Sequence, residues 1–274
     1  MGQRMTNLPD TTYLMTELDK GWLTVWLNRP DIKNAMSRAL TDELQTVLDL
    51  IRDDRTVRGM TLRGKDGVFC AGGDLKEFKE NFQKADKSLD EVAEYSLHIG
   101  EMFDALSTLP MPVIALVEGP AMAGGFGLVC ACDVVIVTED AKFAMTEAAI
   151  GIPPAQIIPH VVNRLGLPAA RRMVMTAARI GSQEALSIGL ADFVTKDARE
   201  AEAKEAEIRK AVMRCAPNAN AVSKEIIFAS QTLLGKEIID FAAKGFAEAI
   251  IGEEGREGIA SFLEKRKPRW AEEN

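Results

Sequence analysis

Apolar and polar positions alternate with a period of two near the N-terminus of the chain. Two such runs, 12–17 and 22–27, flank the turn sequence Asp19-Lys20-Gly21, a pattern that is typical of a β-hairpin. Further along, apolar residues recur with helical spacing over residues 40–52, and Ser37 before them suits a helix N-cap. The sequence therefore predicts a hairpin that leads into an amphipathic helix.

Strand-like and helix-like patterns continue to alternate as far as residue 195. The same criteria place further strands at 59–63, 68–71, 112–117, 133–138, 142–144 and 191–195. They place further helices at 89–106, 124–131 and 182–188. The polar segment 78–88 is predicted to be either helical or mobile. Strands and helices that alternate in this way indicate an α/β fold.

The pattern changes near residue 197, where an almost continuous helical signal begins and runs to residue 269. We therefore expect two parts, an α/β core over residues 1–196 and a helical region over residues 197–274. The helical region carries apolar stripes such as Ile226 with Ile227 and Leu233 with Leu234, which so small a unit does not fully cover by itself. These stripes predict a homo-oligomer.

Composition places the chain among ordinary globular proteins. It has 274 residues, of which 47% are hydrophobic and 27% are charged, and this balance is not that of a disordered or membrane protein. Glu118 interrupts the longest apolar stretch well before it reaches the length of a membrane span. Arg4, Asn7 and Asp10 interrupt any apolar segment that a secretory signal would need, so a cytoplasmic location is expected.

The formal net charge of −8 argues against a general nucleic-acid-binding protein, which needs a basic face. The four cysteines lack the paired spacing of zinc sites, and the chain has only two histidines, so no metal site is expected. Cys130 and Cys132 are expected to be buried thiols and not to form disulfides.

Two glycine-containing loops each follow a predicted strand and open into a helical segment. The first runs over residues 69–75 and contains Gly73, and the second runs over residues 118–127 and contains Gly124. Backbone N–H groups at the start of a helix lack an intrahelical partner, so they suit an anion or a developing oxyanion. Neither loop has the glycine spacing of a nucleotide-binding motif. Either loop by itself is most simply a turn or a close-packing point.

Together and in this order, the two loops resemble the enoyl-CoA hydratase/isomerase family, also called the crotonase family. The matching pieces are 27–30, 34–36, 69–75, 112–115, 124–125, 132–134, 143–147, Gly151, 181–189 and 261–266. The resemblance implies a crotonase-like spiral of ββα units with a helical C-terminal trimerisation region, assembled as a trimer or a dimer of trimers. It also implies an acyl-CoA thioester substrate, with no cofactor beyond the CoA that the substrate carries.

The resemblance also implies roles for individual residues. The backbone N–H groups of Gly73 and Gly124 would hold the thioester oxygen while an enolate forms. The residues that the resemblance assigns to CoA and the acyl chain are Lys33, Ala35, Ala71, Asp74, Leu75, Phe126 and Lys265. Lys265 and Lys267, reaching from a neighbouring subunit, are candidates to meet phosphate; a solvated charge run at a helix end is the competing interpretation.

One departure from the family pattern bears on the reaction. The two-carboxylate hydratases hold water between two glutamates, and here Glu147 matches the second while Gly127 stands at the first. Gly127 is expected to leave space beside the reacting carbons, shaped by Phe126 and Met145. Glu101 or Glu77 could replace the missing carboxylate, although an exposed helical position is the simpler interpretation of both.

Three functions follow from this pattern. The leading hypothesis is a hydratase of 2-enoyl-CoA thioesters, with a branched or glutaconyl-type acyl chain suggested by the segment 151–159. An isomerase that moves protons with one glutamate is the close alternative. A non-catalytic acyl-CoA-binding protein is the third. Dehalogenase and dienoyl-CoA isomerase activities fit less well, because the stretch 153–156 contains no acid.

Overall fold

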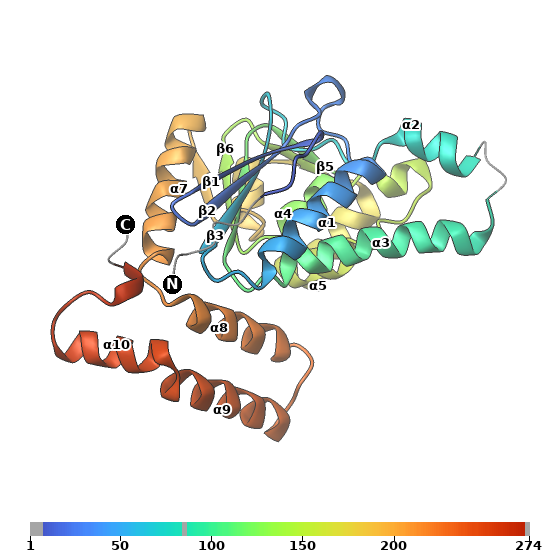
Figure 1. Cartoon of the computed structure of the whole chain (residues 1–274). Coiled ribbons are helices and arrows are strands. Elements are labelled where there is room, and N and C mark those ends of the chain that lie inside the picture. The colour runs from blue at the N-terminus through green and yellow to red at the C-terminus, as the bar shows by residue number, and fades with distance from the viewer. Residues whose placement is uncertain (1–7, 84–86, 272–274) are drawn as a thin grey trace.

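The computed structural model describes residues 8–83 and 87–271, and its centre is a six-stranded sheet in the order β1-β2-β3-β4-β6-β9 (Figure 1). The hairpin pair β1·β2 is antiparallel and all later pairs are parallel. The strands of this sheet are β1 (Leu14–Asp19), β2 (Trp22–Leu27), β3 (Gly59–Gly64), β4 (Val113–Val117), β6 (Val134–Thr138) and β9 (Phe193–Thr195). A smaller sheet contains β5 (Pro120–Met122), β7 (Lys142–Ala144) and β8 (Arg179–Gly181) in the order β5-β7-β8.

Helices cover both faces of the large sheet. The α-helices of the first 196 residues are α1 (Arg38–Arg52), α2 (Leu75–Phe78), α3 (Leu89–Ser107), α4 (Gly124–Ala131), α5 (Ile158–Thr176) and α6 (Ser182–Ser187). Those that follow are α7 (Ala198–Val212), α8 (Pro217–Ala229), α9 (Lys236–Ile251) and α10 (Glu253–Leu263). Short helical turns are η1 (Pro30–Ile32), the π-helical η2 (Lys79–Gln83), η3 (Glu147–Ile150) and η4 (Arg269–Ala271).

The central strand β4 shows how the two faces are buried. All five of its residues are buried, as expected for a parallel strand with helices on both sides. Val113, Ala115 and Val117 belong to the main core with α1, α3 and α4. Ile114 and Leu116 point to the other face, where a smaller cluster includes Trp22 of β2 and Ala201 of α7.

Side-chain caps fix the starts of several helices. Ser37 accepts a hydrogen bond from the Leu40 N–H at the start of α1, which confirms the predicted N-cap. Ser88 and Glu91 form a reciprocal capping box at the start of α3. Asp197 caps α7 through the Glu200 N–H. These caps explain why the predicted starts of these helices lie within two residues of the observed ones.

Some predicted elements differ from the structure. Residues 68–71 form only an isolated bridge between Cys70 and Ala121, because the chain there turns away to build a loop. Strands β5 and β8 and helix α5 were missed: β5 lies inside the glycine-rich segment, and α5 contains both Pro168 and a break at Gly166. The segment 78–88 is helical up to residue 83, and its residues 84–86 lie outside the described part of the chain.

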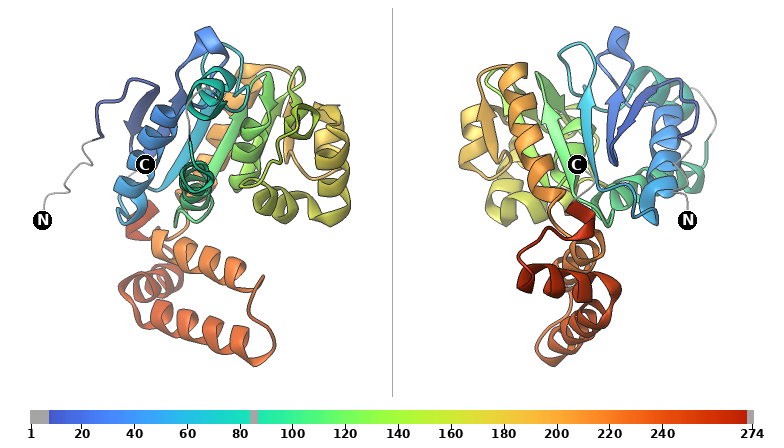
Figure 2. Two further views of the ribbon diagram at one scale, coloured as in Figure 1. Left: turned by 90° about the vertical axis from the view of Figure 1, so that its right-hand side faces the viewer. Right: turned by 60° about the vertical axis from the view of Figure 1, so that its left-hand side comes forward.

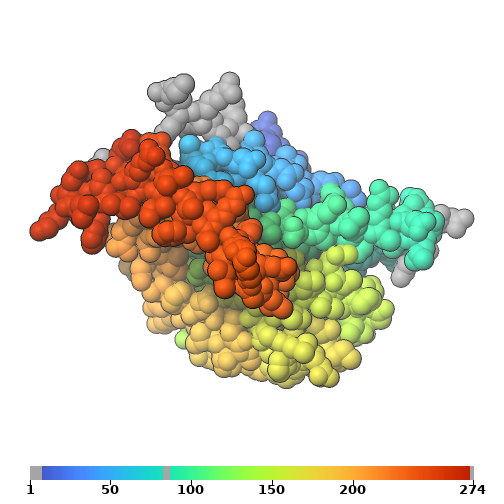
Figure 3. Space-filling model, turned by 90° about the horizontal axis from the view of Figure 1, so that it is seen from below, coloured from blue at the N-terminus to red at the C-terminus, as the bar shows by residue number. Residues whose placement is uncertain are grey.

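The last three helices leave the core. Helix α7 packs on β4, β6 and β9, whereas α9 contacts both α8 and α10. Figures 1 and 2 show α8–α10 as an arm below the core, and Figure 3 shows these helices extending past its edge. The predicted division at residue 197 remains a prediction; the packing shows that the arm itself begins after α7.

The arm presents a strongly apolar surface. The exposed fractions of Leu234, Phe246 and Phe262 are 75%, 65% and 82%. Further exposed apolar side chains on the arm are Ile227, Ile239, Phe241, Ile250, Ile251, Ile259 and Leu263. In the described part of the chain, no helix combines the length and hydropathy needed to cross a membrane.

Gly59 provides a test of the packing around Trp22. A Cβ atom at Gly59 would lie 2.3 Å from Cζ3 of Trp22, whose indole is 1% exposed. Overpacking of this kind costs about 1–3 kcal/mol, so we expect Gly59→Ala to lower the free energy of unfolding by that amount in urea denaturation. The same substitution made beside Trp22→Leu should cost distinctly less. Equal costs in the two backgrounds would contradict the proposed overlap.

Candidate active site

The first glycine loop is held against the segment before α1 by a parallel bridge. Met36 donates its N–H to the Gly72 carbonyl at 2.8 Å, and its own carbonyl accepts from the Asp74 N–H at 2.9 Å. In a parallel bridge the residue between the two bonds directs its N–H to the opposite side. The Gly73 N–H therefore points away from Met36, and within the described chain it has no acceptor.

The second loop brings another free N–H beside the first. Gly124 is the first residue of α4, so its N–H has no intrahelical partner and no other acceptor in the described residues. Ala123 before it has φ 50° and ψ −120°, a strained conformation for a residue with a Cβ, and its N–H bonds to the Ala144 carbonyl at 2.8 Å.

Glycine leaves room where the two loops meet. A Cβ atom at Gly124 would lie 2.2 Å from Cε of Met36, so a larger residue there would displace the end of that side chain. A Cβ atom at Gly72 would lie 2.7 Å from the Cβ of Ala123, and the φ of +97° at this residue also favours glycine.

Both N–H groups border a cavity of about 440 Å³. Most of its wall is apolar and comes from the ends of α2 and η2, from one face of α3 and from the loop before α5. The apolar residues of this wall are Met36, Leu75, Phe78, Phe82, Val92, Ile99, Phe103, Ile150, Ile152, Pro153, Pro154, Ala155 and Ile157. The polar side chains that line the cavity are Tyr95, Ser96, Thr146, Glu147 and Gln156. The volume and the mostly apolar lining of this cavity are typical of a site that binds a small molecule.

Glu147 is the carboxylate of this cavity. It is the first residue of η3, and its Oε2 is buried without a hydrogen-bond partner in the described part of the chain. Burial raises the pKa of the Glu147 carboxyl above the ordinary value, and a hydrogen bond from its own backbone N–H only partly offsets this. A partly desolvated carboxylate with a free oxygen suits proton transfer.

The expected space beside Gly127 does not exist. A Cβ atom at Gly127 would lie 2.4 Å from Cγ2 of Ile157 and 3.1 Å from Cε1 of Phe103. The prediction of extra room was therefore wrong: apolar side chains from α3 and the loop before α5 occupy it. Phe126 and Met145 do not shape the cavity either, because both are buried in the core and line no part of it.

Of the other residues predicted to bind CoA or the acyl chain, some line the cavity and some lie beside it. Ala71 and Leu75 line the cavity. Asp74 is next to it, where it caps α2 and pairs with Arg29 at 3.2 Å. Lys33 has a left-handed backbone, and its carbonyl accepts from the Ala71 N–H at 3.0 Å. That contact places residues 33–35 beside the first loop.

Two predicted residues lie elsewhere. Phe126 has 0% exposure and packs edge-on against Phe143 with ring centroids 6.3 Å apart, so it is a core residue rather than a substrate contact. Lys265 follows α10 on the arm with a positive φ, and it does not line this cavity within the described chain.

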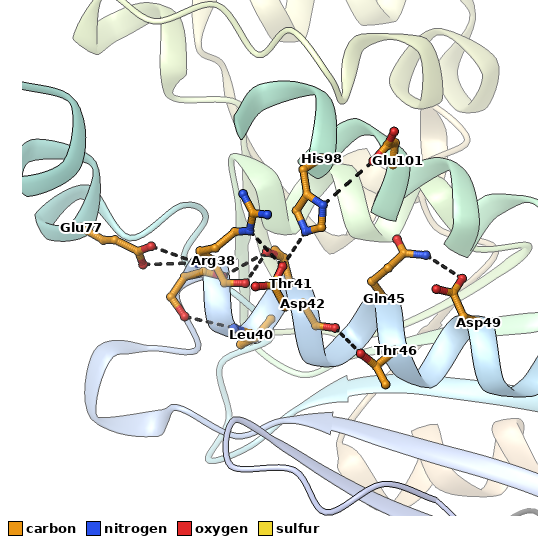
Figure 4. Close-up of polar contacts among 11 residues, drawn as sticks. Arg38, Leu40, Thr41, Asp42, Gln45, Thr46, Asp49, Glu77, His98 and Glu101 are labelled. Atoms are coloured by element: carbon orange, nitrogen blue, oxygen red, sulfur yellow. Dashed lines mark hydrogen bonds and ion pairs between the residues drawn. The ribbon is translucent and has the colours of Figure 1, made fainter. Parts of the chain in front are cut away.

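Neither alternative carboxylate lies in the cavity. Both oxygens of Glu77 accept from the backbone N–H of Arg38, at 3.1 and 3.3 Å, so this side chain holds the start of α1 (Figure 4). Glu101 is 63% exposed and lies 4.0 Å from Nδ1 of His98, whose other ring nitrogen contacts Asp42 at 2.6 Å. Glu101 therefore has the exposed helical position that was predicted, whereas the expected exposure of Glu77 was wrong, because its side chain is half-buried against the start of α1.

The cysteines of the core lie outside the lining of the cavity. Cys70 is buried behind the first loop, and desolvation raises the pKa of its thiol to about 12, so it stays protonated. Cys130 and Cys132 are buried too, as predicted. No cluster of three metal-ligating side chains occurs among residues 8–83 and 87–271.

Two parts of the cavity wall were not found from the sequence. Phe78, Phe82 and Tyr95 form one aromatic cluster with ring centroids 4.8–5.9 Å apart. The spacing of four residues between Phe78 and Phe82 was the available signal. The second part is Gln156, whose Nε2 donates to Oγ of Ser96 at 2.9 Å; Gly100 gives it room, because a Cβ there would lie 2.3 Å from Oε1.

Comparisons with known proteins agree with this geometry. The family model for enoyl-CoA hydratase/isomerase matches residues 17–273. A putative enoyl-CoA hydratase of Thermus thermophilus is 33% identical over 93% of this chain and 100% of its own length. The mitochondrial methylglutaconyl-CoA hydratase of Mus musculus is 28% identical over 93% of this chain and 81% of its own length.

A solved structure agrees as well. Pseudomonas aeruginosa AtuE superimposes with a TM-score of 0.92 and 44% identity, and the match covers 95% of this chain and 100% of that one. The predicted fold class is thereby confirmed.

The raised pKa of Glu147 has a consequence for stability. The folded protein binds the Glu147 proton more tightly than the unfolded chain does, so deprotonation destabilises the fold above the folded pKa. Glu147→Gln removes this penalty and should raise the melting temperature at pH 7. The difference should disappear below the unfolded value of about 4.3, where both states are protonated. Calorimetric melting of both proteins from pH 3.5 to 8 measures it; a gap that widens toward low pH would contradict the assignment.

Proposed function

Because the chain belongs to the enoyl-CoA hydratase/isomerase family, we propose that it adds water to the double bond of a 2-enoyl-CoA thioester. One observation carries the proposal: Glu147 and the free N–H groups of Gly73 and Gly124 border the same cavity. The reaction needs two N–H donors for the thioester oxygen and one group that moves a proton. It needs no cofactor beyond the CoA of the substrate.

In the proposed reaction the two N–H groups bind the thioester carbonyl and stabilise the charge that develops on its oxygen. Both belong to backbone held in place by other bonds, so no reorganisation is needed when the enolate forms. One donor of this kind typically contributes about 3 kcal/mol to transition-state stabilisation. The backbone near Lys33 and Ala35, with Ala71 and Asp74, is the proposed path of the pantetheine and adenosine.

Glu147 then acts on one water molecule in two steps. It accepts a proton from the water while the water oxygen forms its bond to C3, and the C2–C3 double-bond electrons move toward the thioester as an enolate. The protonated Glu147 then gives the same proton to C2, and the carbonyl is restored. The product carries hydroxyl at C3 and hydrogen at C2, and Glu147 returns to its starting state.

A branched, methylglutaconyl-type acyl group is the proposed substrate class. The support is the similarity to a relative named as a methylglutaconyl-CoA hydratase. The lining of the cavity is compatible with this class, because it offers the polar pair Gln156 and Ser96 in addition to the aromatic cluster of Phe78, Phe82 and Tyr95.

Isomerisation is the second candidate, and one observation favours it. The wall beside Gly127 is closed by Ile157 and Phe103, so no second carboxylate stands opposite Glu147 in the described chain. A single carboxylate is enough to carry a proton between C2 and C4 of a 3-enoyl chain. A non-catalytic acyl-CoA-binding protein remains the third candidate and predicts binding without turnover.

The exposed apolar arm supports the proposal that the chain assembles with threefold symmetry, as a trimer or a dimer of trimers. With side chains such as Leu234, Phe246 and Phe262, the arm exposes more apolar surface than a monomeric protein usually does. We expect light scattering at micromolar concentration to give three or six times the mass of 29.9 kDa. Replacing Phe246 and Phe262 by Glu should reduce that mass; a monomeric wild-type protein would rule the assembly out.

Turnover tests the role of Glu147. Glu147→Gln keeps the shape but removes the basic oxygen, so we expect turnover to fall by roughly 100-fold or more. The Kd for the thioester should change little, because the oxygen contacts are backbone. The matched control is Glu139→Gln, which removes an exposed carboxylate outside the cavity and should keep its activity. Full activity in Glu147→Gln would assign the chemistry to another group.

Isotope labelling separates the candidate reactions. In ¹⁸O-labelled water, a hydratase places the label on C3 of the product, whereas an isomerase shifts the double bond without gaining oxygen. Crotonyl-CoA, a branched glutaconyl-CoA and a 3-enoyl-CoA should be compared as substrates. Binding of all three without conversion would leave only the non-catalytic function.

A further inference from the structure

A second cavity, of about 660 Å³, lies on a different part of the molecule. It shares no lining residue with the cavity that contains Glu147, which is called the acyl cavity from here on after its proposed ligand. It lies between the β1–β2 turn, the C-terminal end of α7 and the segment from Arg266 to η4. Figure 1 shows these segments at the left, whereas α2 and α3 of the acyl cavity are at the right. We name it the basic cleft.

Six cationic side chains line the basic cleft, in a protein whose formal net charge is −8. They are Lys20, Arg209, Lys210, Arg214, Arg266 and Lys267. Trp22, Met213, Pro268 and Ala271 make up the rest of its lining and are largely apolar. A concave site lined by one sign of charge over low-dielectric walls concentrates ions of the opposite sign.

Two of the six cations already have carboxylate partners. Arg209 lies 3.8 Å from Asp19 and 3.9 Å from Glu205. Arg266 bonds to Glu257 at 2.6 and 2.9 Å, and this pairing holds the pKa of the Glu257 carboxyl at about 2. These two arginines therefore have a structural role at the edges of the cleft.

The other four cations have no such partner. Within the described residues, no carboxylate lies within ion-pair distance of Lys20, Lys210, Arg214 or Lys267, and no side-chain hydrogen bond is formed by them. They come from three segments far apart in the sequence, which meet only in the folded chain.

The dipole of α7 does not account for these charges. Cations near a helix C-terminus can serve by binding the last carbonyls. Here the carbonyls of Arg209, Ala211 and Val212 accept from the N–H groups of Met213, Arg214 and Cys215, at 2.9, 3.2 and 2.9 Å. Beyond the helix, Arg58 donates to the carbonyls of Met213 and Cys215 at 3.4 and 2.6 Å. Lys210 and Arg214 thus remain available to a ligand.

We propose that the basic cleft binds a phosphorylated nucleoside, with its phosphates among the four free cations and its base against the apolar lining. The volume suits a ligand of that size and exceeds what a lone phosphate needs. Lysine and arginine are the side chains that bind phosphate most often. A long nucleic acid is not the expected ligand, because the net charge of the whole protein is negative.

We assign the cleft to a free nucleotide such as ADP. The nucleotide end of the substrate CoA, which the family resemblance already relates to Lys267 of a neighbouring copy, is the alternative that the test must exclude. The site does not depend on the proposed hydratase activity, because none of its residues lines the acyl cavity.

Titration calorimetry of the full-length protein at about 0.15 M salt tests the cleft, since screening at that ionic strength suppresses weak surface attraction. The probes are ADP, adenosine 3′,5′-bisphosphate and inorganic phosphate. We expect one nucleotide to bind per chain. The variant K210A/R214A should bind it at least about tenfold more weakly, as the loss of charge-assisted bonds implies.

The control is K236A/K244A, which removes two charges from α9, where these lysines are 87% and 79% exposed. It should bind nucleotide like the wild type. If both variants bound nucleotide equally more weakly than the wild type, net charge alone would explain the binding and the proposal would be overturned. The proposal would also be overturned if no nucleotide bound, or if only inorganic phosphate bound, as an adventitious ion only. Circular dichroism and acyl-CoA turnover verify that K210A/R214A is folded.

A competition experiment identifies the source. Adenosine 3′,5′-bisphosphate is titrated into protein saturated with acyl-CoA. Continued binding supports a free-nucleotide site. Displacement would overturn the proposal, because the cleft would then be part of the CoA site of another copy. A failed Glu147 assay affects neither outcome.

Discussion

The backbone pairing of Met36 with residues 72–74 is the constraint on which the site depends. Its two hydrogen bonds turn the Gly73 N–H away from Met36, and Gly73 lines the cavity. The Met36 side chain then packs where a side chain of Gly124 would lie, so the second loop approaches the first. Both N–H donors thus follow from one contact between the segment before α1 and the first glycine loop. Glycine is favoured at residues 72 and 124, because a Cβ there would meet the Cβ of Ala123 and the end of the Met36 side chain.

Much of this arrangement could be predicted from the sequence, because local signals fix it. Ser37 and the apolar period after it located α1, and the Gly124 boundary of α4 was predicted to the residue. The grouping of Gly73, Gly124 and Glu147 was expected from the resemblance, and the three do border one cavity. Their chemical roles remain proposals, because geometry alone does not measure turnover.

The failures share a physical cause: they concern which side chains fill a given volume. Gly127 suggested an opening, yet Ile157 from thirty residues further along occupies it. Phe126 lies two residues from an N–H donor, but its ring points into the core against Phe143. Sequence spacing specifies the backbone path well, whereas long-range packing decides what lies beside it. The aromatic cluster and Gln156 were missed for the same reason.

Backbone groups and side chains contribute to different parts of the proposed acyl cavity. The two N–H groups that are proposed to hold the thioester oxygen are main-chain groups, which side-chain substitutions elsewhere in the wall do not remove. Most of the wall opposite them comes from one short stretch, residues 146–157, together with one face of α3. Changes in that stretch other than at Glu147 would therefore reshape the pocket and leave both N–H groups in place. Such an organisation makes substrate range evolvable, because the side chains that shape the pocket can change while the two backbone groups are kept.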